Sequence, residues 1–497
     1  MTKKLYTAPN SQIYAWATGA FASHFLIQTF LQAGVIFTVG FGLSPVVIGW
    51  AMMVPRFVDA LVDPYLGHRS DETHTRWGRR KPYLVVGSVL GAIFMAAMWW
   101  ASPSWSQTAQ LAYLTIVGTL FFICYGLYTM AWTAVGYELT DEYHERSRVM
   151  AAAAFAIAIV NLCAAWCFRA ALMPIFGGAV SGMRWISAGV AVVVVATAFV
   201  ATKYCKERFT QSNRVHVPLG TAIKTAMTNK PFVILLLIKL SDTLGGRVGG
   251  TLMGYLGLYM LCNGDKVLST TLTGIGGTIG TVLSFAMVPF VKPLSVRLGK
   301  RAALIAGSAV GLIAALMSPI ILTSGHPYWS LIPTIFIAPL STLAFTISSA
   351  IVPDICDMDE LKTGQRREGL FTSVMAFMAK MEISLCTLVS GYLVSFAGVN
   401  VKLVNQAPHV VHKLFLIGLV PTILFALTSF LLTLKFSMTE AQMDDVRGQL
   451  DARHKLRLET EGGNEIYGVN GDEGPDGELG QGMIAEGERA MTAAASK

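Results

Sequence analysis

Two aspartates stand four residues apart in the segment RFVDALVDP, residues 56–64, which is otherwise almost wholly apolar. On a helix, Asp59 and Asp63 share one face, with their carboxylates about 6 Å apart along the axis. Two like charges in apolar surroundings do not both ionise without compensation, so either a cation such as Na⁺ lies between them or one of them holds a proton. The alternative is a static ion pair with Arg56 or with a lysine from another helix. We favour a site that binds and releases a cation, because ionisable groups in membrane-spanning segments are usually functional.

The composition of the chain is that of a membrane protein. Of its 497 residues, 53% are hydrophobic and 14% are charged, and a soluble chain of this length needs more polar surface. Apolar stretches long enough to cross a bilayer, about 20 residues each, recur along the chain. The sequence therefore predicts an all-α integral membrane protein. The twelve expected transmembrane helices are 12–38, 44–67, 83–102, 109–135, 149–174, 184–203, 231–260, 271–292, 301–323, 327–351, 370–396 and 411–435.

The basic residues are concentrated in alternate connections. If the N-terminus is inside, the cytoplasmic connections hold most of the arginines and lysines, and the opposite connections hold only Arg184, Lys266, Lys402 and Lys413. This asymmetry predicts a multi-pass protein of the inner membrane with both termini in the cytoplasm. The net charge of +8 is explained by these dispersed loops, so nucleic acid is not expected as a partner.

Two pairs of similar connections divide the membrane region into halves. DPYLGHRSDETHTRWGRRKPYL after the second helix is similar to VKPLSVRLGKRAAL after the eighth, and VGYELTDEYHERSR after the fourth corresponds to VPDICDMDELKTGQRREG after the tenth. Two parallel repeats are the layout of the major facilitator fold, which holds its substrate between two pseudo-symmetric six-helix bundles. The predicted parts are an N-terminal half 1–203, a cytoplasmic central loop 204–229, a C-terminal half 230–436 and a cytoplasmic tail 437–497. The tail has a helical pattern at its start and is otherwise expected to be disordered.

The same segments resemble a known transporter family. DALVDPYLGHRSDETHTRWGRRKPYL is similar to the helix-two signature of the glycoside–pentoside–hexuronide cation symporters, and DICDMDELKTGQRREG followed by MAFMAKMEIS is similar to their entry into helix eleven. The resemblance implies that Asp59 and Asp63 contribute to a cation site and that Lys380 faces it. Sodium-using relatives place an asparagine and a helix-four threonine where this chain has Val62 and Tyr125. Because Na⁺ needs several oxygen ligands, we expect H⁺ rather than Na⁺ as the coupling ion.

Substrate-binding residues are also implied by this resemblance. Sugar-transporting relatives carry aspartates in helices one and four, where this chain has His24 and Tyr128. Trp132 matches an aromatic that lies against the sugar ring, but packing between helices explains it equally well. His24 has two further interpretations, a proton relay or a satisfied interior histidine. The loss of both acids favours an anionic solute such as a uronide. The residues expected to bind substrate are His24, Arg56, Tyr128, Trp132, Arg247 and Lys380.

Three further charged residues lie on the expected seventh and eleventh helices. Lys239 would add positive charge to the cavity, but Asp242, three residues on, can neutralise it. Glu382 comes two residues after Lys380 and therefore points to another face of that helix.

The cytoplasmic loops have two interpretations. RWGRRKP and RLGKR can simply enforce topology, or they can pair with acidic residues of neighbouring helices and latch the inward-closed state. We favour the latch, with Arg79, Arg80, Asp141 and Asp354 as its gating residues.

The predicted function is secondary active transport by alternating access, with a sugar, glycoside or uronide carried together with H⁺ or Na⁺. The alternative is the same fold carrying a lysolipid or another amphipathic or anionic solute. An enzyme is not expected, because the chain has no Walker loop, zinc-binding spacing or nucleophile motif. We expect no cofactor beyond the coupling ion, a small-molecule substrate, membrane lipid around the helices and a monomer.

Overall fold

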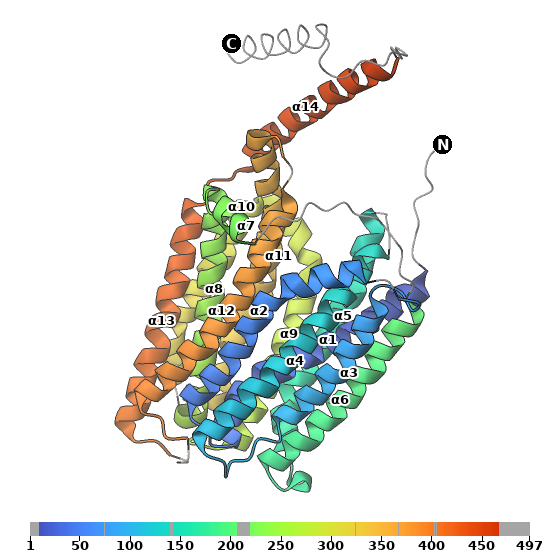
Figure 1. The fold of residues 1–497 in the computed structure, drawn as a ribbon. Helices are drawn as coiled ribbons and strands as arrows, with labels where there is room; N and C mark the ends of the chain where they lie inside the picture. The colour runs from blue at the N-terminus through green and yellow to red at the C-terminus, as the bar shows by residue number, and fades with distance from the viewer. Residues whose placement is uncertain are drawn as a thin grey trace. The chain divides into compact units, whose positions relative to one another are not determined.

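The computed structural model describes residues 9–73, 75–139, 143–205, 219–323, 325–365, 367–401, 403 and 405–466. Within these ranges the regular structure is helical and includes no strand (Figure 1). The long helices are α1 (Asn10–Val35), α2 (Pro45–Glu72), α3 (Lys81–Met98), α4 (Gln107–Glu138), α5 (Tyr143–Ala171), α6 (Ala179–Tyr204), α8 (Lys230–Leu256), α9 (Lys266–Leu298), α10 (Lys300–Thr323), α11 (Ile332–Thr363), α12 (Glu368–Ala397), α13 (Pro408–Lys435) and α14 (Glu440–Ile466). The short elements are α7 (Leu219–Ala226), η1 (Ile36–Gly40), η2 (Pro174–Phe176), η3 (Gly257–Leu261) and η4 (Pro327–Leu331).

Eleven of the described helices are long and apolar enough to cross a membrane. A twelfth predicted span coincides with α8, which has 27 residues but carries Lys239, Asp242 and Arg247 in its interior. These charges lower its hydropathy without shortening it. Each of the twelve predicted spans thus falls on a long helix, and the all-α membrane fold is confirmed.

Two of the remaining helices lie outside the predicted spans. The central segment 204–229 contains α7, and its residues 206–218 lie outside the described part of the chain. The start of the tail, where the sequence has a helical pattern, forms α14 from Glu440 to Ile466. This segment is rich in Ala, Gln, Leu, Arg and Glu, which have high helix propensity, and it contains the helical pattern that the sequence showed at the start of the tail. Residues after 466 are not described.

Local sequence explains where several helices begin. The Ser106 side chain accepts a hydrogen bond from the Ala109 backbone N–H at the start of α4, and Asn229 does the same for Phe232 at the start of α8. Asp265 accepts from two backbone N–H groups at the start of α9. These caps satisfy backbone donors that have no partner in the first turn of a helix.

The membrane helices form two groups by their contacts. Helix α1 packs against α5 and α6, α3 against α4 and α6, and α2 against α4; in the second half α8 packs against α13, and α11 against α9 and α10. Figure 1 shows the two groups side by side, with α2 of the first group running along α12 of the second. This arrangement is that of two packed six-helix bundles.

The halves approach each other closely at one end, where α1 and α12 finish and α2 and α9 start. The Lys266 ammonium donates to the Val39 backbone carbonyl at 2.7 Å. Gly391 lies so close to α2 that an added Cβ would be 2.4 Å from the Pro45 carbonyl oxygen, and Gly274 leaves room for the Trp166 ring in the same way. Small residues therefore allow the close approach of helix backbones, and we call this the closed end of the bundle.

Candidate functional site

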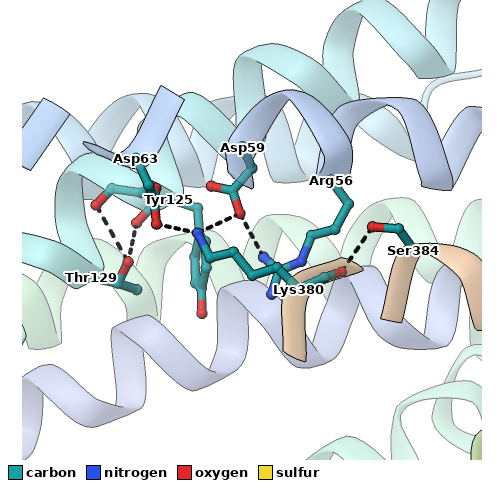
Figure 2. Close-up of polar contacts among 8 residues, drawn as sticks. Arg56, Asp59, Asp63, Tyr125, Thr129, Lys380 and Ser384 are labelled. Atoms are coloured by element: carbon teal, nitrogen blue, oxygen red, sulfur yellow. Dashed lines mark hydrogen bonds and ion pairs between the residues drawn. The ribbon is translucent and has the colours of Figure 1, made fainter. Parts of the chain in front are cut away.

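Helix α2 brings Asp59 and Asp63 to the boundary between the two halves. Asp59 is only 1% exposed, and its Oδ2 lies 3.0 Å from Nη1 of Arg56, one turn earlier on the same helix. The Arg56 guanidinium lies 4.9 Å from the centre of the Phe122 ring on α4, a separation that allows a cation–π interaction. The i, i+3 and i, i+4 spacing read from the sequence thus places all three charged residues on one side of α2, as Figure 2 shows.

Lys380 crosses from α12 to both carboxylates. Its Nζ lies 2.9 Å from Oδ2 of Asp59 and also forms an ion pair with Oδ2 of Asp63 (Figure 2). Two cations, Arg56 and Lys380, therefore face two carboxylates, and the formal charge of the group sums to zero. Removal of one partner from such a buried group leaves an uncompensated charge, which is strongly unfavourable.

The second oxygen of each carboxylate is left without a partner. Oδ1 of Asp59 and Oδ1 of Asp63 are buried, and no hydrogen bond to either is present among the described residues. Both point toward Gly126 on α4: a Cβ there would be 2.9 Å from Oδ1 of Asp63 and 3.3 Å from Oδ1 of Asp59. The missing side chain of Gly126 thus leaves space beside two carboxylate oxygens. Sequence reasoning missed this residue, because its alignment with α2 depends on how α4 packs.

Two hydroxyl groups near the acids already donate to backbone carbonyls. The Thr129 hydroxyl on α4 donates to the Tyr125 carbonyl at 2.9 Å, so its single proton already has a partner (Figure 2). On α12 the Ser384 hydroxyl donates back to the Lys380 carbonyl at 3.0 Å. Val62, between the two acids, has no oxygen in its side chain. The surroundings supply carboxylates rather than the amide and hydroxyl ligands of sodium-using relatives.

Two of the residues expected to bind substrate are used for packing between α1 and α4. Tyr128 is 0% exposed, and its hydroxyl donates to the Gly19 carbonyl at 3.0 Å. The Trp132 ring stacks on Trp16 with centroids 4.8 Å apart, and each indole N–H donates to the backbone carbonyl of the other tryptophan. The interpretation of Trp132 as a packing residue therefore has direct geometric support, and the same description fits Tyr128.

The other expected substrate residues are distributed between the halves. His24 on α1 is half-buried, with Nδ1 3.2 Å from the Ala20 carbonyl oxygen. Arg56 and Lys380 belong to the charged group described above. Arg247 is exposed on α8, and its charge acts on Glu382 of α12, whereas the ion pairs of the two acids of α2 among the described residues are with Arg56 and Lys380. The structure thus brings Arg56 and Lys380 together and leaves His24 and Arg247 apart from them.

One of the residues expected to gate transport has a partner within its own half. Asp354 on α11 forms an ion pair with Lys300 at the start of α10, with Oδ2 and Nζ 2.5 Å apart. Arg80 is buried and Arg79 is half-buried, and both take part in further interactions. The side chain of Asp141 lies outside the described residues. A latch between the halves is not tested by these contacts and stays a prediction.

Comparison with known proteins agrees with this architecture. Residues 15–440 match the family described as MFS/sugar transport protein. The chain is 25% identical to the isoprimeverose transporter of Lactiplantibacillus pentosus over 405 residues, which cover 78% of this chain and 81% of the relative. It is 24% identical over 430 residues to the glucuronide carrier protein homolog of Escherichia coli strain K12, covering 84% and 90%.

Solved structures show the same fold at greater evolutionary distance. The nucleoside transporter NupG superimposes with a TM-score of 0.57 at 14% sequence identity, covering 86% of this chain and 98% of NupG. The resemblance to the glycoside–pentoside–hexuronide symporters that the sequence indicated is confirmed by the named relatives. The chain therefore belongs to the MFS/sugar transport family and is a multi-pass membrane transporter of small molecules, not an enzyme.

Proposed function

We propose that this protein couples the movement of a glycoside or uronide to that of a cation, with H⁺ as the cation rather than Na⁺. The observation that carries the proposal is the ion pair between Lys380 of one half and both acids of the other. We further propose that the protein lies in the inner membrane, with both termini in the cytoplasm, and works as a monomer surrounded by lipid. The basic connections identified in the sequence support this orientation.

The coupling step follows from the charge balance of the site. With both carboxylates ionised, Lys380 holds α12 against α2 and the site is neutral. A proton on Asp63 removes one negative charge, so the attraction for Lys380 falls and the link between the halves weakens. The bound cation thus changes the relative free energies of the two orientations of the transporter, as alternating access requires.

A proton suits this site better than a metal ion. Na⁺ needs a shell of several oxygens, and the described neighbours offer chiefly the two unpartnered Oδ1 atoms. A proton needs only one of those oxygens. The ion pairs of Lys380 also stay intact until a proton binds, whereas Na⁺ would have to share the site with the cations Arg56 and Lys380.

The proposed substrate is a neutral or anionic sugar derivative. The names of two relatives, an isoprimeverose transporter and a glucuronide carrier protein homolog, support pentosides and uronides as the first candidates. The cations Lys380 and Arg247 favour the uronide, since each can pair with a carboxylate. Recognition of the sugar through Trp132 has less support, because its indole already stacks on Trp16.

The proposal is tested by uptake into proteoliposomes. A panel of labelled pentosides, hexosides and uronides is offered with an imposed pH gradient, then with sodium removed and with a proton ionophore added. Uptake above equilibrium that survives sodium removal and is abolished by the ionophore supports H⁺ symport. Uptake that follows a sodium gradient and ignores the ionophore would refute the choice of ion.

The two acids are tested by isosteric neutralisation. Asp59→Asn and Asp63→Asn are each expected to abolish accumulation while exchange of substrate across the membrane continues. Asp445→Asn, which changes an exposed carboxylate of α14, is the matched control and should accumulate normally. Full accumulation by either site variant would remove the coupling role of that aspartate.

The gating proposal concerns the basic connections. We expect Arg79→Gln or Arg80→Gln to slow transport while substrate binding is retained, since the latch would act on the rate of reorientation. Unchanged transport rates in both variants would dismiss the latch and leave these arginines as determinants of topology.

A further inference from the structure

Helix α8 carries charged residues and glycines on one face. At 100° per residue, Lys239, Asp242, Gly246 and Gly250 fall within about 80° of one another. Gly246 and Gly250 have no atom within 4 Å of the position a Cβ would take, and Asp242 is exposed. Exposure of such a face to lipid would be unfavourable. We conclude that it borders the space between the two halves.

Glu382 on α12 is directed to the charges of this face. The positive charges of Arg247 and Lys239 stabilise the ionised form of its carboxyl group, and the negative charge of Asp242 destabilises that form. Glu382 is only 8% exposed, and its buried Oε1 has no hydrogen-bond partner among the described residues. Neither Arg247 nor Lys239 lies within ion-pair distance of it in the described part of the chain. Glu382 is therefore a buried acid with cations near it but not bound to it.

Helix α12 presents its two central charges to opposite neighbours. Lys380 and Glu382 are two residues apart and so point about 160° away from each other. Lys380 reaches the acids of α2, whereas Glu382 feels the charges of α8. Lys380 therefore joins the two halves, whereas Glu382 and the charges of α8 belong to the same half.

Two effects act in opposite directions on the protonation of Glu382. A buried carboxylate without a hydrogen bond is unfavourable and tends to take up a proton. The positive charges of Arg247 and Lys239 oppose this, because they stabilise the ionised form. Any anion that pairs with Arg247 or Lys239 reduces their effect and favours proton uptake by Glu382.

We propose that Glu382 is a second proton-binding group, which takes up a proton when an anionic substrate group pairs with Arg247 and Lys239. The proposal rests on the function proposed above and adds a second proton to the one bound at Asp59 and Asp63. Substrate arrival and proton uptake are linked because the substrate anion and the Glu382 carboxylate compete for the same two cations. The proton moves from water to a Glu382 carboxylate oxygen, and no other bond changes.

The other groups around Glu382 do not replace it. Cys386, one turn along α12, lies close enough to feel its charge. The described residues of α2, α7, α11 and α13, which also pack on α12, add no further charge that acts on Glu382. Among the described residues, the charges that act on the protonation of Glu382 are therefore those of α8.

The first test needs no substrate. Infrared difference spectra between acidic and alkaline pH are recorded for the full chain in lipid vesicles. We expect a carboxylic-acid C=O band that is present in the wild type and in Asp59→Asn and is missing in Glu382→Gln. A Glu382→Gln spectrum identical to that of the wild type would overturn the proposal, whatever the protein transports.

The second test counts protons. Radiolabelled methyl β-D-glucuronide is offered to proteoliposomes with a gradient of one pH unit and the membrane potential clamped at zero. Each coupled proton multiplies the accumulation ratio about tenfold, so two protons give roughly 100-fold and one gives roughly tenfold. We expect the roughly tenfold ratio for Glu382→Gln and the full ratio for Glu360→Gln, which changes another buried glutamate. Equal ratios in the wild type and Glu382→Gln refute the second proton.

The two tests separate this inference from the proposed function. If the wild type does not accumulate the glucuronide, the proposed uronide symport fails, and the infrared band still decides whether Glu382 binds a proton. If the wild type accumulates it and Glu382→Gln does so equally, symport stands and the role of Glu382 is refuted.

Discussion

A methyl group placed at Gly126 distinguishes a proton from a metal ion at the paired acids. In Gly126→Ala the new Cβ would lie 2.9 Å from Oδ1 of Asp63 and 3.3 Å from Oδ1 of Asp59. Ordinary contact begins at 3.4 Å, so Asp63 must retreat by 3.4 − 2.9 = 0.5 Å and Asp59 by 3.4 − 3.3 = 0.1 Å. Insertion of a methyl group into a packed site typically costs about 1–3 kcal/mol.

The expected effect depends on the ion. A metal ion that binds between the two Oδ1 atoms would share its space with the methyl group, and its affinity would fall by about 10- to 100-fold. A proton bound to one oxygen has no such requirement. We therefore expect Gly126→Ala to accumulate substrate under a pH gradient, with the pH of half-maximal uptake moved by less than about one unit.

The assay compares two alanine variants of the same helix. In Gly118→Ala the Cβ would be 3.0 Å from Cγ of Pro55, so this variant also presses α4 against α2, but away from the acids. Uptake is measured for both against external pH and against sodium concentration. Loss of uptake in Gly126→Ala alone, restored by a higher sodium concentration, would show that the site holds Na⁺ and would refute our reasoning.

Three further outcomes test other contacts. Lys380→Met leaves the acids with one cation fewer, and loss of one partner of a buried ion pair destabilises a protein by about 3–5 kcal/mol. We expect substrate accumulation to be lost while substrate exchange continues. Normal accumulation would contradict the coupling scheme. Trp132→Phe removes the hydrogen bond to the Trp16 carbonyl and should lower the free energy of unfolding by about 1–2 kcal/mol. Thermal unfolding in detergent measures this loss, and a changed substrate KM at unchanged stability would instead favour a sugar-binding role. Gly391→Ala would place a Cβ 2.4 Å from the Pro45 carbonyl oxygen. This clash should raise the ratio of molecules with the closed end open to molecules with it closed roughly tenfold. Distances between spin labels on α2 and α12 report this shift, and an unchanged distribution would contradict it.

The sequence was sufficient for the membrane architecture because that information is local. Each transmembrane helix requires its own apolar run, and every predicted span coincides with a long helix. Even α8, whose interior charges reduce its hydropathy, was identified by its length. In the tail, the helical pattern noted at its start lies within α14, Glu440–Ile466.

The candidate site was predictable only in part. Asp59 and Asp63 could be paired because four residues bring side chains to the same face of any helix. Lys380 lies 317 residues from Asp63, and it was connected to the acids by family resemblance rather than by spacing. No local pattern marked Gly126, because its importance lies in which atoms of α2 it faces.

Tyr128 and Trp132 also show what the sequence could not predict. Their positions on α4 were read correctly as helical, but a membrane helix is apolar toward both lipid and protein, so hydropathy does not say which face meets the substrate. The packing of α1 on α4 decides this, and it turns both rings toward Gly19 and Trp16.

By itself, the sequence determined that this chain crosses a membrane repeatedly, that it has two related halves, and that two carboxylates lie together on the second helix. These properties follow from apolar length, repeated connections and helical period, which are fixed along the chain. Only the tertiary structure decided that Lys380 bridges both acids, that their free oxygens meet at Gly126, and that Glu382 faces α8. Such contacts join helices far apart in the chain, and their geometry is set by how small residues let whole helices approach.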